Sequence, residues 1–88
     1  MRVEFLSKFN KDISSIKVKS TKLKLIEVID LIEQANSMSD IKRLKKLKGS
    51  KDAYRIRLGD YRLGVFINKD LVQFARFVHR KDIYKVFP

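Results

Sequence analysis

Three arginines, Arg55, Arg57 and Arg62, are the residues whose types and spacing best suit chemistry on an anion. They lie in residues 53–68, AYRIRLGDYRLGVFIN, where apolar and polar residues alternate on both sides of a Gly-Asp pair. Alternation with a period of two, interrupted by two turn residues, predicts a β-hairpin. A two-residue loop places Arg57 opposite Arg62 and Arg55 opposite Gly64, so the three arginines share one face.

The expected pair of Arg57 and Arg62 indicates what this face could bind. Like charges directly opposite each other destabilise a sheet, so a sequence that keeps such a pair is expected to hold an anion there. Phosphate suits the planar guanidinium fork best. The alternative is a solvated hairpin face with no ligand, and the charge pattern alone leaves it open.

The net charge of the chain is +11 and is unevenly distributed. Residues 1–40 carry 7 Lys or Arg against 6 Asp or Glu, whereas residues 41–88 carry 14 against 4. A charge excess confined to one part of a chain is typical of a surface that binds a polyanion. The 88 residues suffice for one small domain, residues 1–88, and are too few for two hydrophobic cores.

The densest basic run lies just before the hairpin. Beside an arginine-bearing sheet it is interpreted as a nucleic-acid tract, the alternative being a solubilising connector. Lys81 near the C-terminus is expected to join it. The residues of the run are Lys42, Arg43, Lys45, Lys46, Lys48 and Lys51.

Metal and cofactor chemistry is not expected. The chain has no cysteine and a single histidine, His79, so a zinc or iron site would need mostly carboxylate ligands. No signal peptide is apparent, and no apolar run approaches the ~20 residues of a transmembrane helix. A cytoplasmic protein is therefore expected.

The rest of the chain must supply the elements that position the hairpin. Its apolar periodicity predicts an α+β fold of order βααβββ, with an N-terminal strand and a helical hairpin packed on a mainly antiparallel four-stranded sheet. Ser7 and either Ser20 or Thr21 are expected to cap the helices, and the second helix is expected to be largely buried because its apolar stripe is wide. The expected elements are strands at 2–6, 53–58, 61–68 and 71–78, helices at 8–16 and 22–35, and a final turn near 83–87.

Two details of these elements matter for the hairpin. The loop before residues 71–78 could contain two or three residues, which places either Phe77 or Arg76 beside Arg62. In the final turn, Ile83 and Phe87 are expected to pack inward and to leave Tyr84 free.

In these motifs the sequence resembles the RelE/ParE superfamily of toxins from type II toxin–antitoxin systems. The resemblance covers essentially the whole chain and is closest to the RelE-like branch. It is carried by LKGSKDAYRIRLGDYRLGVFI and RFVHRKDIYKVF, and within them by the L-K-G connector, the Y-R-I-R and Y-R pair and the H-R-x-x-x-Y ending.

The resemblance implies a ribosome-dependent mRNA endoribonuclease. RelE-like toxins enter the ribosomal A site and cut mRNA without a metal or cofactor, by attack of the 2′-hydroxyl on the adjacent phosphate. The implied partners are a RelB-like antitoxin, in a toxin–antitoxin hetero-oligomer, and the ribosome with its rRNA and mRNA.

The same resemblance assigns roles to particular residues. Arg62 stands where the family has its phosphate-binding arginine, and Arg80 matches the C-terminal catalytic basic residue. Tyr84 matches the tyrosine that stacks on or orients the substrate. Arg55 and Arg57 stand where the best-known member has lysines.

The lysine-to-arginine departure leaves the general base unassigned, because arginine has a pKa of about 12 or higher and is a poor base. His79 is the only side chain with a reference pKa near neutrality, about 6.5, and is therefore a candidate for the base. The alternative is a strand-end residue with a structural hydrogen bond. Two other readings stay open. One is a ParE-like toxin that inhibits DNA gyrase, and the other is a non-catalytic RNA-binding module of the same fold.

Overall fold

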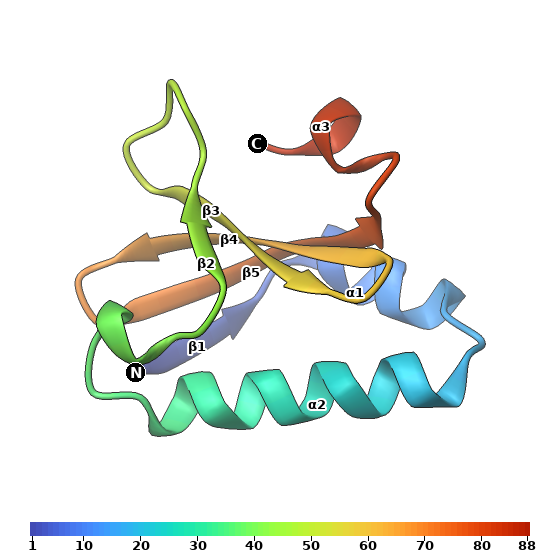
Figure 1. Cartoon of the computed structure of the whole chain (residues 1–88), viewed down its shortest axis with the longest axis horizontal. Coiled ribbons are helices and arrows are strands. Elements are labelled where there is room, and N and C mark those ends of the chain that lie inside the picture. The colour runs from blue at the N-terminus through green and yellow to red at the C-terminus, as the bar shows by residue number, and fades with distance from the viewer.

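A five-stranded sheet, in the order β1-β5-β4-β3-β2, forms the centre of the computed structural model, which covers residues 1–88. Strand β1 is parallel to β5, and the other neighbours are antiparallel. Helices α1 and α2 cover one face of the sheet, while α3 and the β2–β3 loop lie on the other side (Figure 1). The elements are β1 (Arg2–Phe5), α1 (Ser7–Ser15), α2 (Lys19–Gln34), a 3₁₀ turn (Met38–Asp40), β2 (Leu44–Lys46), β3 (Ala53–Leu58), β4 (Tyr61–Asn68), β5 (Leu71–His79) and α3 (Ile83–Val86).

The predicted α+β class is confirmed, with one strand more than the four expected. The additional strand is β2, within the basic run, and it pairs Leu44 with Ile56 and Lys45 with Arg55. Three residues are too short for their alternation to be recognised in a sequence. The short strand is formed because Leu44 packs against the buried residues under the sheet.

The β3–β4 hairpin has the predicted register. Arg57 lies opposite Arg62, and Arg55 lies opposite Gly64. The next loop contains two residues, but neither expected neighbour of Arg62 was right, because Val78 lies opposite it. A register shift between Gly64 and Val65 places one additional residue in β5, and such a bulge moves every later pair by one position.

The helix boundaries and the burial of α2 differ from the prediction. Helix α1 begins at Ser7 and α2 begins at Lys19, and neither has a side-chain cap, so the expected capping serines and threonine were wrong. Only two residues of α2, Leu25 and Ile32, are fully buried. A helix that lies on a sheet as an outer layer buries one stripe only, and the wide apolar stripe therefore leaves Leu31 exposed.

Buried side chains form two clusters, one on each face of the sheet. The main core lies under α1 and α2 and consists of Phe9, Ile16, Leu25, Ile32, Ile56, Leu58, Leu63, Val65, Ile67, Val72, Phe74 and Phe77. The second cluster lies under the C-terminal segment and consists of Leu47, Ala53, Ala75, Ile83 and Phe87. No helix is both long and apolar enough to cross a membrane.

Helix α1 is tied to the bulged part of β5 by one carboxylate. Asp12 accepts two hydrogen bonds from the guanidinium of Arg76, at 2.8 and 3.0 Å, and a third from the backbone N–H of Phe77, at 2.9 Å. Both side chains of the ion pair are largely buried. Arg76 is thus paired with Asp12 and is not available to a ligand.

Candidate functional site

A hollow of about 660 Å³ lies beside the tip of the β3–β4 hairpin. No apolar and no acidic side chain lines it. We call it the cationic hollow, and its lining residues are Lys24, Arg43, Lys45, Arg55, Arg57, Gly59 and Arg62.

The register of strands β2, β3 and β4 brings most of these cations together. Residues of β3 alternate between the two faces, so Arg55 and Arg57 lie on the same face as Ala53 of the second cluster. Strand β4 places Arg62 opposite Arg57, and β2 places Lys45 opposite Arg55. Directly opposite residues have Cβ atoms about 5 Å apart, so these cations are close neighbours.

Two further cations come from other parts of the fold. Arg43 lies just before β2 with a φ of 63°, a left-handed conformation that is uncommon for a residue other than glycine. Lys24 comes from α2 and reaches the hollow across the hairpin tip. Sequence reasoning missed Lys24, because nothing local to α2 distinguishes it from the other lysines of that helix.

The cations of the hollow have no acidic partner. The ion pairs of the chain are Arg2–Asp70, Arg76–Asp12 and Lys85–Asp82, and none of them involves a residue of the hollow. Six positive charges thus share one concave site without internal compensation. An anion bound there would relieve their mutual repulsion.

Arg62 is held in place before any ligand arrives. Its Nη1 donates hydrogen bonds to the carbonyl oxygens of Gly59, at 2.8 Å, and of Tyr61, at 2.9 Å. Partial burial, followed by the charges of Arg57, Arg55 and Arg80, lowers the pKa of Arg62 from its ordinary value. Arginine titrates so far above neutrality that the side chain remains a cation.

The two C-terminal candidates lie near these arginines. Tyr84 is 65% exposed, and Cζ of Arg55 lies 5.4 Å from the centroid of its ring, within the range of a cation–π contact. Arg80 follows β5, and its backbone N–H donates to the carbonyl of Asp60 at 2.8 Å. Arg80 is not among the residues that line the hollow, although its positive charge is one cause of the lowered pKa of Arg62.

His79 lies away from the cationic hollow. Its ring makes an edge contact with Tyr61, whose own ring stacks on Phe77 of the main core. Its Nδ1 accepts a hydrogen bond from the backbone N–H of Lys81 at 3.2 Å. These contacts place His79 on the helix-covered side of the sheet, where its partners belong to the fold and not to the cationic hollow.

The basic run is divided by the structure. Arg43 and Lys45 line the cationic hollow. Lys42 lines the neighbouring groove instead. Outside both lie Lys46, Lys48, Lys51 and Lys81, which are exposed.

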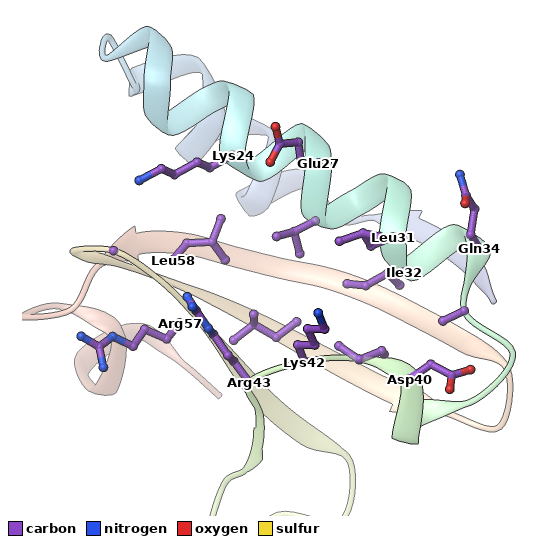
Figure 2. A pocket seen from close by; sticks show the side chains of 15 residues that line it. Lys24, Glu27, Leu31, Ile32, Gln34, Asp40, Lys42, Arg43, Arg57 and Leu58 are labelled. Carbon is purple, nitrogen blue, oxygen red and sulfur yellow. The ribbon is translucent and has the colours of Figure 1, made fainter.

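An apolar groove of about 730 Å³ adjoins the hollow and runs between α2, residues 40–43 just before β2, and the end of β3. Lys24, Leu58 and Arg57 mark one end of this groove, and Gln34 and Asp40 mark the other (Figure 2). Lys24, Arg43, Arg57 and Gly59 line both the groove and the cationic hollow. Among its apolar lining residues are Val28, Leu31, Ile32, Ile41, Ile56 and Leu58.

The structure brings no three His, Asp or Glu side chains together as a group that could hold a metal ion. The charged side chains that line the hollow are all cations, and the exposed Tyr84 lies against one of them, Arg55. Such a set can bind a phosphate and stabilise negative charge that develops on it.

Comparison with known proteins identifies relatives along the whole chain. The model of a family described as the ParE toxin of the type II toxin–antitoxin system parDE matches residues 3–84. Toxin RelE3 of Methanocaldococcus jannaschii is 42% identical over 90 residues, covering 100% of both chains.

Solved structures give the same result. The RelB–RelE antitoxin–toxin complex of Methanococcus jannaschii contains a chain with a TM-score of 0.81 and 35% identity, covering 97% of this chain and 99% of that one. A chain of the RelE–RelB complex of Pyrococcus horikoshii OT3 has a TM-score of 0.72 and 26% identity, covering 93% and 97%. The predicted resemblance is thus confirmed, and the chain belongs to the RelE/ParE superfamily as a RelE-like toxin of a type II toxin–antitoxin system.

Proposed function

We propose that this toxin is an endoribonuclease that cuts mRNA on the ribosome by attack of a 2′-hydroxyl on the adjacent phosphate. The observation that carries the proposal is the cationic hollow, in which Arg62 is already oriented and no acid competes for the anion. A preoriented cation loses little on reorganisation when charge develops, which is the main requirement for electrostatic catalysis.

In this mechanism the scissile phosphate lies at Arg62 and Arg80. The 2′-oxygen forms a bond to phosphorus and loses its proton, and the 5′-oxygen leaves and gains one. The products are a 2′,3′-cyclic phosphate and a 5′-hydroxyl. Arg62 and Arg80 stabilise the additional negative charge of the pentavalent phosphate, and Arg55 and Arg57 hold its oxygens.

Two other features support this assignment. Tyr84 is exposed over Arg55, where it can stack on a base beside the bound phosphate. Every titratable residue that lines the hollow is a Lys or an Arg, so catalysis rests on charge stabilisation rather than on a strong protein base. The exposed Lys46, Lys48, Lys51 and Lys81 serve as contacts to the rRNA backbone.

The test is Arg62→Ala in single-turnover cleavage of mRNA on saturating programmed ribosomes. Loss of one well-placed transition-state cation should lower the rate about 10²- to 10³-fold, by analogy with deletion of an oxyanion-hole donor. Ribosome binding should change little, because the other cations remain. Lys51→Ala is the matched control, since it removes an exposed cation outside the hollow and should leave the cleavage rate unchanged. A wild-type rate for Arg62→Ala would remove Arg62 from the reaction centre.

A ParE-like toxin that inhibits gyrase is the second candidate, because the matching family model carries the ParE description. The combination of Arg55, Arg57, Arg62, Arg80 and Tyr84 favours the nuclease. Primer extension on a translated message, with and without ribosomes, separates the candidates. Cuts confined to ribosome-bound message support the nuclease, gyrase-dependent DNA damage supports the second candidate, and binding without either supports a non-catalytic RNA-binding module.

We also infer that an acidic, amphipathic segment of a RelB-like antitoxin occupies the apolar groove. Two relatives were solved as complexes with RelB. The groove combines 7 apolar lining residues with a positive balance of charge, which suits apolar residues flanked by carboxylates. Its charged lining residues are Lys24, Lys42, Arg43 and Arg57 against Glu27 and Asp40. Because Lys24, Arg43 and Arg57 also line the hollow, a segment bound there would cover part of the proposed reaction site.

Two exposed leucines of α2 test this location. Leu31 lines the groove, whereas Leu23 does not, although their exposed fractions are similar, 64% and 55%. Leu31→Glu should weaken binding of the cognate antitoxin at least about tenfold through lost apolar burial and added repulsion of acidic groups. Leu23→Glu is the control and should bind as the wild type does in calorimetric titration. Equal affinities for the two variants would exclude the groove as the antitoxin site.

A further inference from the structure

Phe87 is buried on the sheet although it follows a helix of a single turn. It is only 4% exposed, and its ring lies 5.1 Å from that of Phe66, centroid to centroid. A Cβ atom added to Gly64 would come within 2.8 Å of Cγ and Cδ2 of the Phe87 ring. The ring therefore occupies space that exists only because residue 64 has no side chain.

Gly64 is required for space rather than for backbone conformation. The glycines with positive φ are Gly49 and Gly59, both in loops, and Gly64 is not one of them. An alanine at residue 64 would have an ordinary strand conformation and would fail only by overlap with Phe87. The close contact is thus a specific fit between β4 and the C-terminal segment.

This fit determines where Tyr84 lies. Helix α3 is too short to be stable by itself, so its position depends on its anchors. Ile83 is fully buried at its start, and Phe87 is buried beyond its end and donates its backbone N–H to the carbonyl of Ile83 at 2.9 Å. Tyr84 lies between the two anchors and points outward over Arg55.

The sheet register connects the anchor to the cationic hollow. Gly64 and Arg55 are directly opposite each other on β4 and β3. Phe87 covers the first of this pair, and Tyr84 covers the second. Displacement of the Phe87 ring would therefore displace Tyr84 from the arginine beneath it.

We propose that the contact of Phe87 with Gly64 holds Tyr84 over Arg55 and thereby orients the substrate base beside the bound phosphate. Phe87 is a positioning residue, since it acts through Tyr84 and does not touch the hollow itself. The role in substrate orientation rests on the proposed nuclease function, whereas the effect on Tyr84 is a property of the free protein.

The test combines an NMR signal with cleavage, in Phe87→Ala and in Gly64→Ala. The first variant removes the ring and the second fills its space, so two opposite changes should have the same effect. The ring of Tyr84 should shift the side-chain proton signals of Arg55 in the wild-type protein, and both variants should lose that shift. Val86→Ala is the control, because Val86 belongs to the same turn but is partly exposed and should keep the shift.

Cleavage gives the second measurement. On saturating programmed ribosomes, Phe87→Ala should cut about ten- to a hundredfold more slowly, as Tyr84→Ala should, because a stacked base contributes about that much. The double variant Tyr84→Ala/Phe87→Ala should be no slower than Tyr84→Ala, since both changes remove one interaction. Additive losses would show that Phe87 acts on stability or binding independently of Tyr84, which would overturn the proposal.

The two measurements distinguish a failure of the proposed nuclease function from a failure of the proposed positioning of Tyr84. A wild-type protein that cuts no RNA would contradict the nuclease, while the Arg55 signal would still report on the anchor. If either Phe87→Ala or Gly64→Ala keeps the Arg55 shift, the contact does not position Tyr84. Gly64→Ala also covers the case in which Phe87→Ala does not fold, because it keeps the apolar Phe87 side chain in the protein and adds only one methyl group to β4.

Discussion

The cations of the hollow are distinguished by how firmly each is held. Arg62 donates to two carbonyl oxygens of its own hairpin, and Arg55 lies against the ring of Tyr84. Lys24, at the edge of the site, has a flexible side chain and makes neither kind of contact. We therefore assign transition-state stabilisation to the arginines and backbone tracking of the RNA to Lys24.

Lys24→Ala should weaken binding of a short single-stranded RNA by one phosphate contact. The logarithm of affinity should then depend less steeply on the logarithm of salt concentration, with a slope lower by about 0.7 for a single strand. Lys19→Ala is the matched control, because it removes an exposed lysine from the same helix outside the hollow. Identical slopes for both variants, measured by fluorescence anisotropy, would mean that Lys24 does not touch the RNA.

Among the elements, α1 is attached to the sheet through Asp12. Its carboxylate accepts two hydrogen bonds from Arg76 and one from the backbone of Phe77, next to the register shift of β5. Hydrogen bonding to Asp12 raises the pKa of Arg76, as expected for a cation that gains a partner. We expect this contact to stabilise the fold and to play no part in ligand binding at the cationic hollow.

Asp12→Ala should lower the free energy of unfolding by about 2–3 kcal/mol, since it removes charge-assisted hydrogen bonds and leaves Arg76 largely buried without a partner. Binding of RNA by the fraction that remains folded should be unchanged. Asp30→Ala removes an exposed carboxylate from α2 and should change stability by less than about 0.5 kcal/mol. Urea denaturation measures both, and equal stabilities of the two variants would contradict the role given to Asp12.

On the scale of the whole molecule, charge separates the chain into two functional parts. Residues 41–88 contain almost all of the excess positive charge and form β2 to α3, the part that surrounds the cationic hollow. The first part is nearly neutral and supplies α1 and α2, which bury the main core. Affinity for nucleic acid is therefore expected to be strongly electrostatic.

Binding of the protein to rRNA fragments should fall by orders of magnitude between about 50 and 300 mM salt, because neutralised phosphates release counterions. An RNA with an uncharged methylphosphonate backbone should bind weakly at every salt concentration. Filter binding across this range checks both expectations. An affinity that hardly changes with salt would mean that the basic surface is not the binding surface.

The sequence by itself determined the features that depend on neighbours along the chain. Alternation and a two-residue loop predicted the register that places Arg57 opposite Arg62, because both are local properties of a hairpin. The inward packing of Ile83 and Phe87 was likewise predictable from helical spacing and is confirmed. The motifs around these residues also predicted the toxin family.

Only the tertiary structure decided which residues meet through space. One additional residue in β5 moved Val78, and not Phe77 or Arg76, beside Arg62, and no local pattern marks such a bulge. His79 lies against Tyr61 on the helix-covered face, while the charge of Arg80, the next residue, lowers the pKa of Arg62. Lys24 lines the cationic hollow because the first half of α2 lies beside the hairpin tip. The packing of a helix on a sheet is fixed by contacts between residues far apart in the sequence.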